Sequence, residues 1–129
     1  MHPIRLAVYA FKRQPFTLAV GFPEGLREHD PEELTPLFVI REEADDTSTI
    51  LFLLPLTTFQ TPTFGGELIW VDVRDEYLVT LEEATVDSLP ARCYYGLSLF
   101  HESDLDSPEF ELTGPMRVRP TRNPANHYV

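Results

Sequence analysis

Short stretches in which apolar and polar residues alternate recur roughly every ten residues along this chain. The clearest is residues 16–22, FTLAVGF, where Phe16, Leu18 and Val20 fall on one face of an extended strand. Prolines and polar turn residues separate the stretches, and proline rarely occurs inside a paired strand. The pattern therefore predicts an all-β protein built from short strands that share one core.

The predicted strands are residues 4–10, 16–22, 37–41, 49–54, 67–73, 77–81, 92–100 and 109–120. The stretch 49–54, TILFLL, is apolar on both faces, which favours a central strand. The stretch 109–120 fits either a strand pair or one bent strand. Short strands with turns between them at this spacing are typical of a β-sandwich, although a β-barrel gives a similar pattern.

One segment, residues 82–89, is expected to form a short helix. Alone it is too short to be stable, so it must be held by the core. Thr80 and Glu83 have the spacing of a capping box, in which the threonine caps the helix. Val86 and Leu89 would then close one end of the core.

The charge of the chain excludes two classes of partner. Its formal net charge is −11, which repels nucleic-acid phosphates and anionic lipid head groups. No apolar run reaches membrane-spanning length, and Lys12, Arg13 and Pro15 interrupt the apolar N-terminal stretch. We expect a soluble, unprocessed protein that binds neither nucleic acid nor membranes.

The length of 129 residues suits one domain with one core. We expect residues 1–122 to form a single β-sandwich domain and residues 123–129 a polar C-terminal tail. Cys93 is the only cysteine, which excludes an internal disulfide and favours a reducing compartment.

The histidines show no spacing that predicts a metal site, so a surface role is expected for each of His2, His29, His101 and His127. The pair Asp104 and Asp106 could begin a calcium site, but the glycine and terminal glutamate of a helix-loop-helix site are missing. A solvated turn is the favoured interpretation of this pair.

No motif of nucleophilic catalysis is present. Cys93 lies on a predicted strand without a nearby histidine, and Ser98 and Ser107 lack the context of a nucleophile elbow. Trp70, the one tryptophan available to stack on a sugar, is more typical of a core residue here. We therefore predict no enzyme activity, no catalytic residue, no metal, no cofactor and no small-molecule substrate.

A longer pattern lies in the second half of the chain, where a strand ending in Val-Thr-Leu leads to Leu-Pro-Ala, a tyrosine strand and a closing strand. Its residues are Val79, Thr80, Leu81, Ala84, Leu89, Pro90, Ala91, Tyr95, Leu97, Leu112, Gly114, Val118 and Pro120. Over roughly residues 37–122, the sequence resembles small immunoglobulin-like proteins of tailed bacteriophages, including the N-terminal domains of upper baseplate proteins. Arg92 stands where the family pattern has glycine.

The resemblance implies an immunoglobulin-like β-sandwich of seven to eight antiparallel strands with at most one short helix. It also implies a non-enzymatic structural protein of a phage particle, either a tail or baseplate component or a capsid-surface decoration protein. Such a protein would bind other virion proteins, form a homo-oligomer, and reside in the virion after synthesis in the bacterial host cytoplasm.

Aromatic side chains are the expected contact residues, because they offer a large contact area at little entropic cost. The candidates for a protein interface are Phe59, Phe64, Tyr94, Phe100 and Tyr128. An alternative function is that of an acidic inhibitor or immunity protein, whose negative charge would mask a basic target protein.

Overall fold

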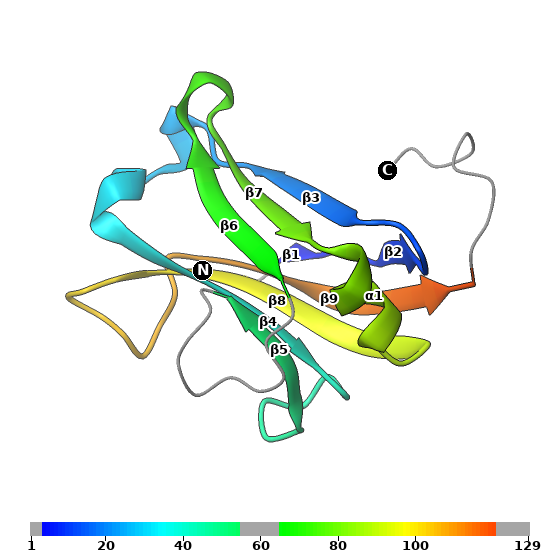
Figure 1. The fold of residues 1–129 in the computed structure, drawn as a ribbon. Helices are drawn as coiled ribbons and strands as arrows, with labels where there is room; N and C mark the ends of the chain where they lie inside the picture. Colours follow the sequence, from blue (N-terminus) through cyan, green and yellow to red (C-terminus); the bar gives the residue numbers. More distant parts are fainter. Residues whose placement is uncertain (1–3, 55–64, 121–129) are drawn as a thin grey trace.

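The computed structural model of the chain describes residues 4–54 and 65–120, which form two β-sheets packed face to face (Figure 1). The strands are β1 (Ile4–Arg5), β2 (Val8–Phe11), β3 (Phe16–Gly21), β4 (Leu34–Arg41), β5 (Ile50–Leu54), β6 (Gly66–Val71), β7 (Glu76–Leu81), β8 (Arg92–His101) and β9 (Phe110–Arg119). The larger sheet has the order β1-β9-β8-β4-β5, with β2 also paired to β9, and the smaller sheet has the order β3-β7-β6.

This strand order is that of an immunoglobulin-like domain. The smaller sheet corresponds to strands B, E and D, and the row β9-β8-β4-β5 corresponds to G, F, C and C′. The predicted β-sandwich is therefore confirmed, and the barrel alternative is wrong.

Alternation of apolar side chains explains how the strands bury one face. Along β3 every second residue, namely Phe16, Leu18 and Val20, is buried, while the residues between them are exposed. Along β8 the residues at every second position from Cys93 to Leu99 are also buried, although Gly96 between them is buried as well. The largest fully buried side chains are Phe22, Phe38, Phe52, Ile40, Leu54, Leu81, Leu97, Leu99 and Met116.

The first strand corrects one detail of the expected fold. Both of its parts, β1 and β2, pair with β9 in parallel rather than antiparallel. Between them the Leu6 N–H donates to the Thr113 carbonyl at 2.9 Å, and the buried Tyr95 hydroxyl donates to the Leu6 carbonyl at 2.6 Å. A side chain at Gly114 would collide with the Leu6 carbonyl, so only glycine allows this close approach of two backbones.

The expected central position of residues 49–54 is wrong, because β5 lies at the edge of the larger sheet and pairs with β4. Phe52 and Leu54 are buried in the core, whereas Leu51 and Leu53 on the other face are half-buried. The apolar residues on both faces of this strand reflect the partial burial of its second face, and they do not show that the strand has a neighbour on each side. Residues 55–64, which follow β5, lie outside the described residues.

The predicted short helix is present as α1 (Glu83–Ser88), and Val86 and Leu89 are buried as expected. The predicted cap is wrong: Thr80 belongs to β7, where it pairs with Thr17 and Glu67, and the residue before the helix makes no side-chain cap bond. The helix is held instead by Thr85, which is fully buried and donates a 2.7 Å hydrogen bond to the Gly65 carbonyl.

Candidate functional site

The outer face of the larger sheet carries a row of arginine and tyrosine side chains across β8, β9 and β2. Arg92 lies opposite Arg117, and Arg117 lies opposite Tyr9 on the other side of β9. Because their strand neighbours Cys93, Met116 and Val8 point into the core, these three side chains point outward.

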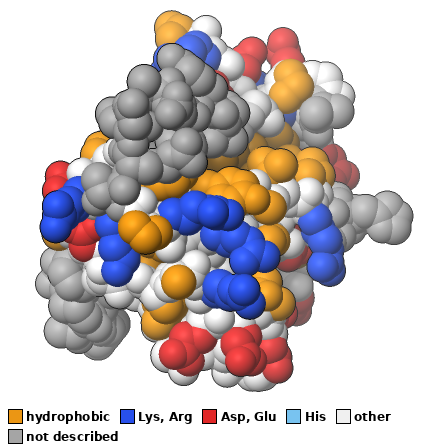
Figure 2. Space-filling view, turned by 90° about the vertical axis from the view of Figure 1, so that its right-hand side faces the viewer, with side chains coloured by type: hydrophobic (Ala, Val, Ile, Leu, Met, Phe, Trp, Pro, Cys, Tyr) orange, Lys and Arg blue, Asp and Glu red, His pale blue; other side chains and the backbone are white. Residues whose placement is uncertain are grey.

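The row belongs to a surface that we call the Arg–Tyr patch, made of Tyr9, Arg92, Tyr94, Arg117 and Arg119. Tyr9 is 39% exposed and Tyr94 is 36% exposed, so both rings offer surface to a partner. The Arg119 guanidinium lies 5.1 Å from the centre of the Tyr9 ring, within range of a cation–π interaction. Figure 2, which views the end of the molecule where β9 finishes, shows Lys and Arg side chains gathered beside hydrophobic ones.

The charge of the Arg–Tyr patch is not neutralised locally. Arg92, Arg117 and Arg119 form no ion pair with any residue that the structure describes. A positive patch on a protein of net charge −11 is a local reversal of sign. Tyrosine and arginine are also the residue types that are enriched at the energetic centres of protein interfaces.

The structure places two of the predicted interface residues. Tyr94 lies in the Arg–Tyr patch, and Phe100 is on the same face of β8 but half-buried. The other predicted residues, Phe59, Phe64 and Tyr128, lie outside the described residues, as does the predicted tail 123–129.

The other four members of the patch were missed by the sequence analysis. A signal for three of them was available, because Arg92 alternates with the core residue Cys93 while Arg117 and Arg119 flank the core residue Val118. Tyr9 could not be found this way, since only the parallel pairing of β2 with β9 brings it beside them.

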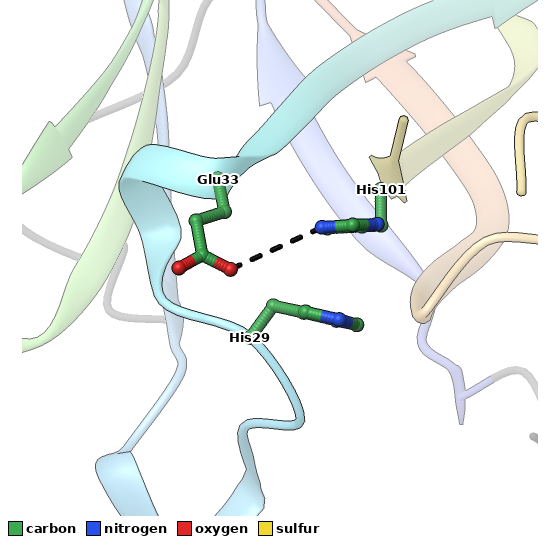
Figure 3. Close-up of side chains that lie close together, drawn as sticks. All are labelled: His29, Glu33 and His101. Carbon is green, nitrogen blue, oxygen red and sulfur yellow. Dashed lines mark ion pairs between the residues drawn. The ribbon is translucent and has the colours of Figure 1, made fainter. Parts of the chain in front are cut away.

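A second group of side chains lies at the other end of β8 and consists of two histidines and three glutamates. Leu34 of β4 pairs with His101, the last residue of β8, so Glu33 lies beside that histidine. The Oε2 of Glu33 is 3.9 Å from Nε2 of His101. The imidazole of His29 stacks on that of His101, with ring centres 3.8 Å apart and planes inclined by 17° (Figure 3).

Glu109, next to the start of β9, holds the loop that carries His29. Its Oε1 accepts hydrogen bonds from the backbone N–H groups of Glu28 and His29, each at 2.8 Å, and lies 3.4 Å from the ring Nδ1 of His29. The Glu109 side chain is only 8% exposed. Its second oxygen, Oε2, and Nδ1 of His29 are buried and have no hydrogen-bond partner among the described residues.

The ring of His101 is held on its other side by Ser103. The Ser103 N–H donates to Nδ1 of His101 at 3.1 Å, and the Ser103 hydroxyl lies 2.6 Å from the same nitrogen. The hydroxyl can accept a proton from Nδ1, so both neutral tautomers of His101 find a partner. Both histidines and Glu109 line a cleft of about 330 Å³ between the loop and the β8–β9 turn.

Arg27 also holds the loop that carries His29. Its guanidinium donates to the Phe22 carbonyl and to the Asp75 carboxylate, each at 2.9 Å, and lies 4.9 Å from the centre of the Trp70 ring. Trp70 is half-buried and packs against the core, as the sequence analysis favoured. The position of His29 is thus fixed from both sides, by Arg27 and by Glu109.

The histidine cluster could not be found from spacing, because its members come from one loop and from the turn between two strands. Among the four histidines, His2 and His127 lie outside the described residues. The pair Asp104 and Asp106 forms part of the β8–β9 turn, where an oxygen of Asp104 accepts the Asp106 N–H at 3.2 Å.

Cys93 is a buried core residue, 1% exposed, and burial raises the pKa of its thiol to about 11. At about pH 8 the thiolate fraction is then only about one in a thousand. We expect Ellman's reagent to label the folded protein far more slowly than the protein in denaturant. Rapid labelling of the folded protein, at a rate similar to that in denaturant, would contradict this placement of Cys93.

Comparison with known proteins gives likenesses in structure and none in sequence. No family model matches the chain, and no curated protein shows significant sequence similarity to it. The RIG-5 IG1 homodimer is 15% identical, with a TM-score of 0.44, over 92% of this chain and 94% of that one. The fold is immunoglobulin-like.

Two further immunoglobulin-like structures are similar to this chain. The first Ig domain of the mouse polymeric immunoglobulin receptor is 13% identical, with a TM-score of 0.48, over 91% of this chain and 92% of that one. The NK cell receptor Nkp44 is 17% identical, with a TM-score of 0.49, over 92% of this chain and 99% of that one. In the described part of this chain, no helix has the length and apolarity needed to cross a membrane.

Proposed function

We propose that this protein is a non-enzymatic structural protein that works through protein–protein contacts, as a component of a phage particle. The observation that carries the proposal is the Arg–Tyr patch, an exposed group of arginines and tyrosines without local counter-charges. The rigid β8–β9 pair beneath it presents these side chains in fixed positions, which lowers the entropic cost of binding.

The chemistry of the patch selects its partner. Arginines without counter-charges favour a surface that carries carboxylates, and this chain has 21 acidic residues against 10 basic ones. A second copy of the chain therefore offers the matching surface. Two patches facing each other across a two-fold axis would repel, so the contact is head to tail and builds rings or longer arrays.

The place in a phage particle rests on the sequence resemblance of residues 37–122. An immunoglobulin-like sandwich with a contact face is consistent with a tail, baseplate or capsid-surface component present in many copies, where avidity strengthens modest contacts. An antibody raised against the chain should label purified particles, whereas particles that lack the chain would contradict this placement.

The distribution of the described acidic segments disfavours the alternative of an acidic inhibitor. Such an inhibitor needs its negative charge on one face. The acidic residues of α1 and those of the β8–β9 turn lie at opposite ends of the sandwich (Figure 1).

Self-association of charge-reversed variants tests the proposed contact. The change Arg92→Glu reverses one charge of the patch, and Arg74→Glu makes the same change at the exposed turn between β6 and β7. Each variant is immobilised, and its binding to the same variant in solution is measured. A mixture with the wild-type chain would not be informative, because the intact patch of the wild-type copy could still bind the variant. We expect Arg92→Glu to weaken self-association by about tenfold or more relative to wild type, and Arg74→Glu by less than about twofold.

Equal weakening by the two variants would show a general charge effect and would contradict the proposed surface. Unchanged association of Arg92→Glu would do so as well. Circular dichroism of both variants confirms that each remains folded, since Arg92 and Arg74 are exposed.

A further inference from the structure

We propose that His29, His101 and Glu33 form a binding site for one divalent transition-metal ion of the zinc class, with Glu109 holding His29 in place. This site lies at the opposite end of β8 from the Arg–Tyr patch, and it is independent of the proposed function.

The donor atoms are already gathered. One potential ligand atom from each of His29, Glu33 and His101 lies within 4.8 Å of the other two. His29 also belongs to a second such group, with Glu28 and Glu109. A zinc ion binds nitrogen and carboxylate oxygen at about 2.0–2.2 Å, so the three ligand atoms have to move closer together around one ion.

A separate observation concerns the carboxylate that holds His29. Oε2 of Glu109 and Nδ1 of His29 are buried without a hydrogen-bond partner among the described residues, and the Glu109 side chain is 8% exposed. Leaving a buried carboxylate oxygen unsatisfied is costly. When the ion binds the other ring nitrogen of His29, Nδ1 carries the ring proton and faces the Glu109 carboxylate 3.4 Å away, and a carboxylate beside a metal-binding histidine is the usual way in which such a ring is oriented.

The donor set identifies the class of metal. Two imidazoles with a carboxylate suit zinc and its neighbours cobalt, nickel and copper, whereas calcium and magnesium require mostly oxygen ligands. Metal binding at Nε2 of His101, on the side of Glu33, requires the ring proton on Nδ1, where the Ser103 hydroxyl can accept it in place of the hydrogen bond that the Ser103 N–H donates to that nitrogen.

The stacked arrangement of the two rings has to change on binding. The nitrogen lone pairs of the two stacked rings lie in two nearly parallel planes, so one imidazole must turn before both rings can bind the same ion. Both histidines line the cleft and are only partly covered, which leaves room for this rotation. This rotation is a specific consequence of the proposal, because metal binding should end the stacking of the two rings.

Calorimetric titration of the full chain with zinc chloride at neutral pH tests the site. We expect one ion per chain, and we expect His29→Gln and His101→Gln each to weaken binding by about 100-fold, with Glu33→Gln weakening it by about tenfold. The matched control is the double variant His2→Gln/His127→Gln, which removes the same kind of side chain elsewhere and should bind as wild type does. Calcium at the same concentration should not compete.

The absence of saturable zinc binding by the wild-type chain would overturn the proposal, and so would loss of binding in the His2→Gln/His127→Gln control. A second measurement avoids dependence on variants that fold poorly. Cobalt added to the wild-type chain should give the visible absorption of a four-coordinate ion, and zinc should abolish it; a spectrum identical to that of aqueous cobalt would also overturn the proposal.

Discussion

Replacing Gly114 by alanine is expected to lower the free energy of unfolding by roughly 3 kcal/mol. The new Cβ would collide with the Leu6 carbonyl, and this is a backbone atom that cannot rotate away. Leu6 is fixed by its hydrogen bonds to Thr113 and Tyr95, so the first strand would have to leave β9. Chemical denaturation followed by fluorescence measures the change.

The matched control is Gly21→Ala, also on a strand, where a Cβ would meet no atom within 4 Å. Its effect should stay within about 0.5 kcal/mol. A similar loss for both substitutions would mean that glycine is required generally in these strands, and it would contradict the close approach of Leu6 to Gly114.

Replacing Phe38 by alanine should lower the free energy of unfolding by about 3–5 kcal/mol. The side chain of Phe38 is fully buried on the inner face of β4, and its ring centre lies 6.2 Å from that of Tyr95. Alanine would leave a cavity between the sheets that neighbouring strands cannot fill. Thermal and urea unfolding measure the change.

Val73→Ala provides the comparison, because Val73 is 92% exposed and should tolerate the change within about 0.5 kcal/mol. If Phe38→Ala cost no more than Val73→Ala, the inner face of β4 would not be the centre of the core.

Much of the fold follows from local alternation in the sequence. The strand at residues 16–22 and the strand at residues 92–100 were placed correctly because period-two burial leaves a direct trace in the residue types. The position of a strand within a sheet leaves no such trace. Residues 49–54 therefore looked central, although β5 is an edge strand, and the parallel pairing of the first strand was not foreseen.

The candidate sites depend even more on long-range pairing. Tyr94 was predicted as a contact residue from its type, but its neighbours Tyr9 and Arg117 join it only through the register of β2 and β8 with β9. His29 and His101 meet because Arg27 and Glu109 hold a loop against the β8–β9 turn. Spacing along the chain carries no information about such a contact.

The molar mass of the wild-type chain in solution tests the central claim most directly. Light scattering across a series of concentrations, at low and high salt, should show a mass that is a multiple of 14.8 kDa and that falls as salt screens the arginines of the Arg–Tyr patch. A mass of 14.8 kDa at every concentration and in both salts would contradict assembly between copies through this patch.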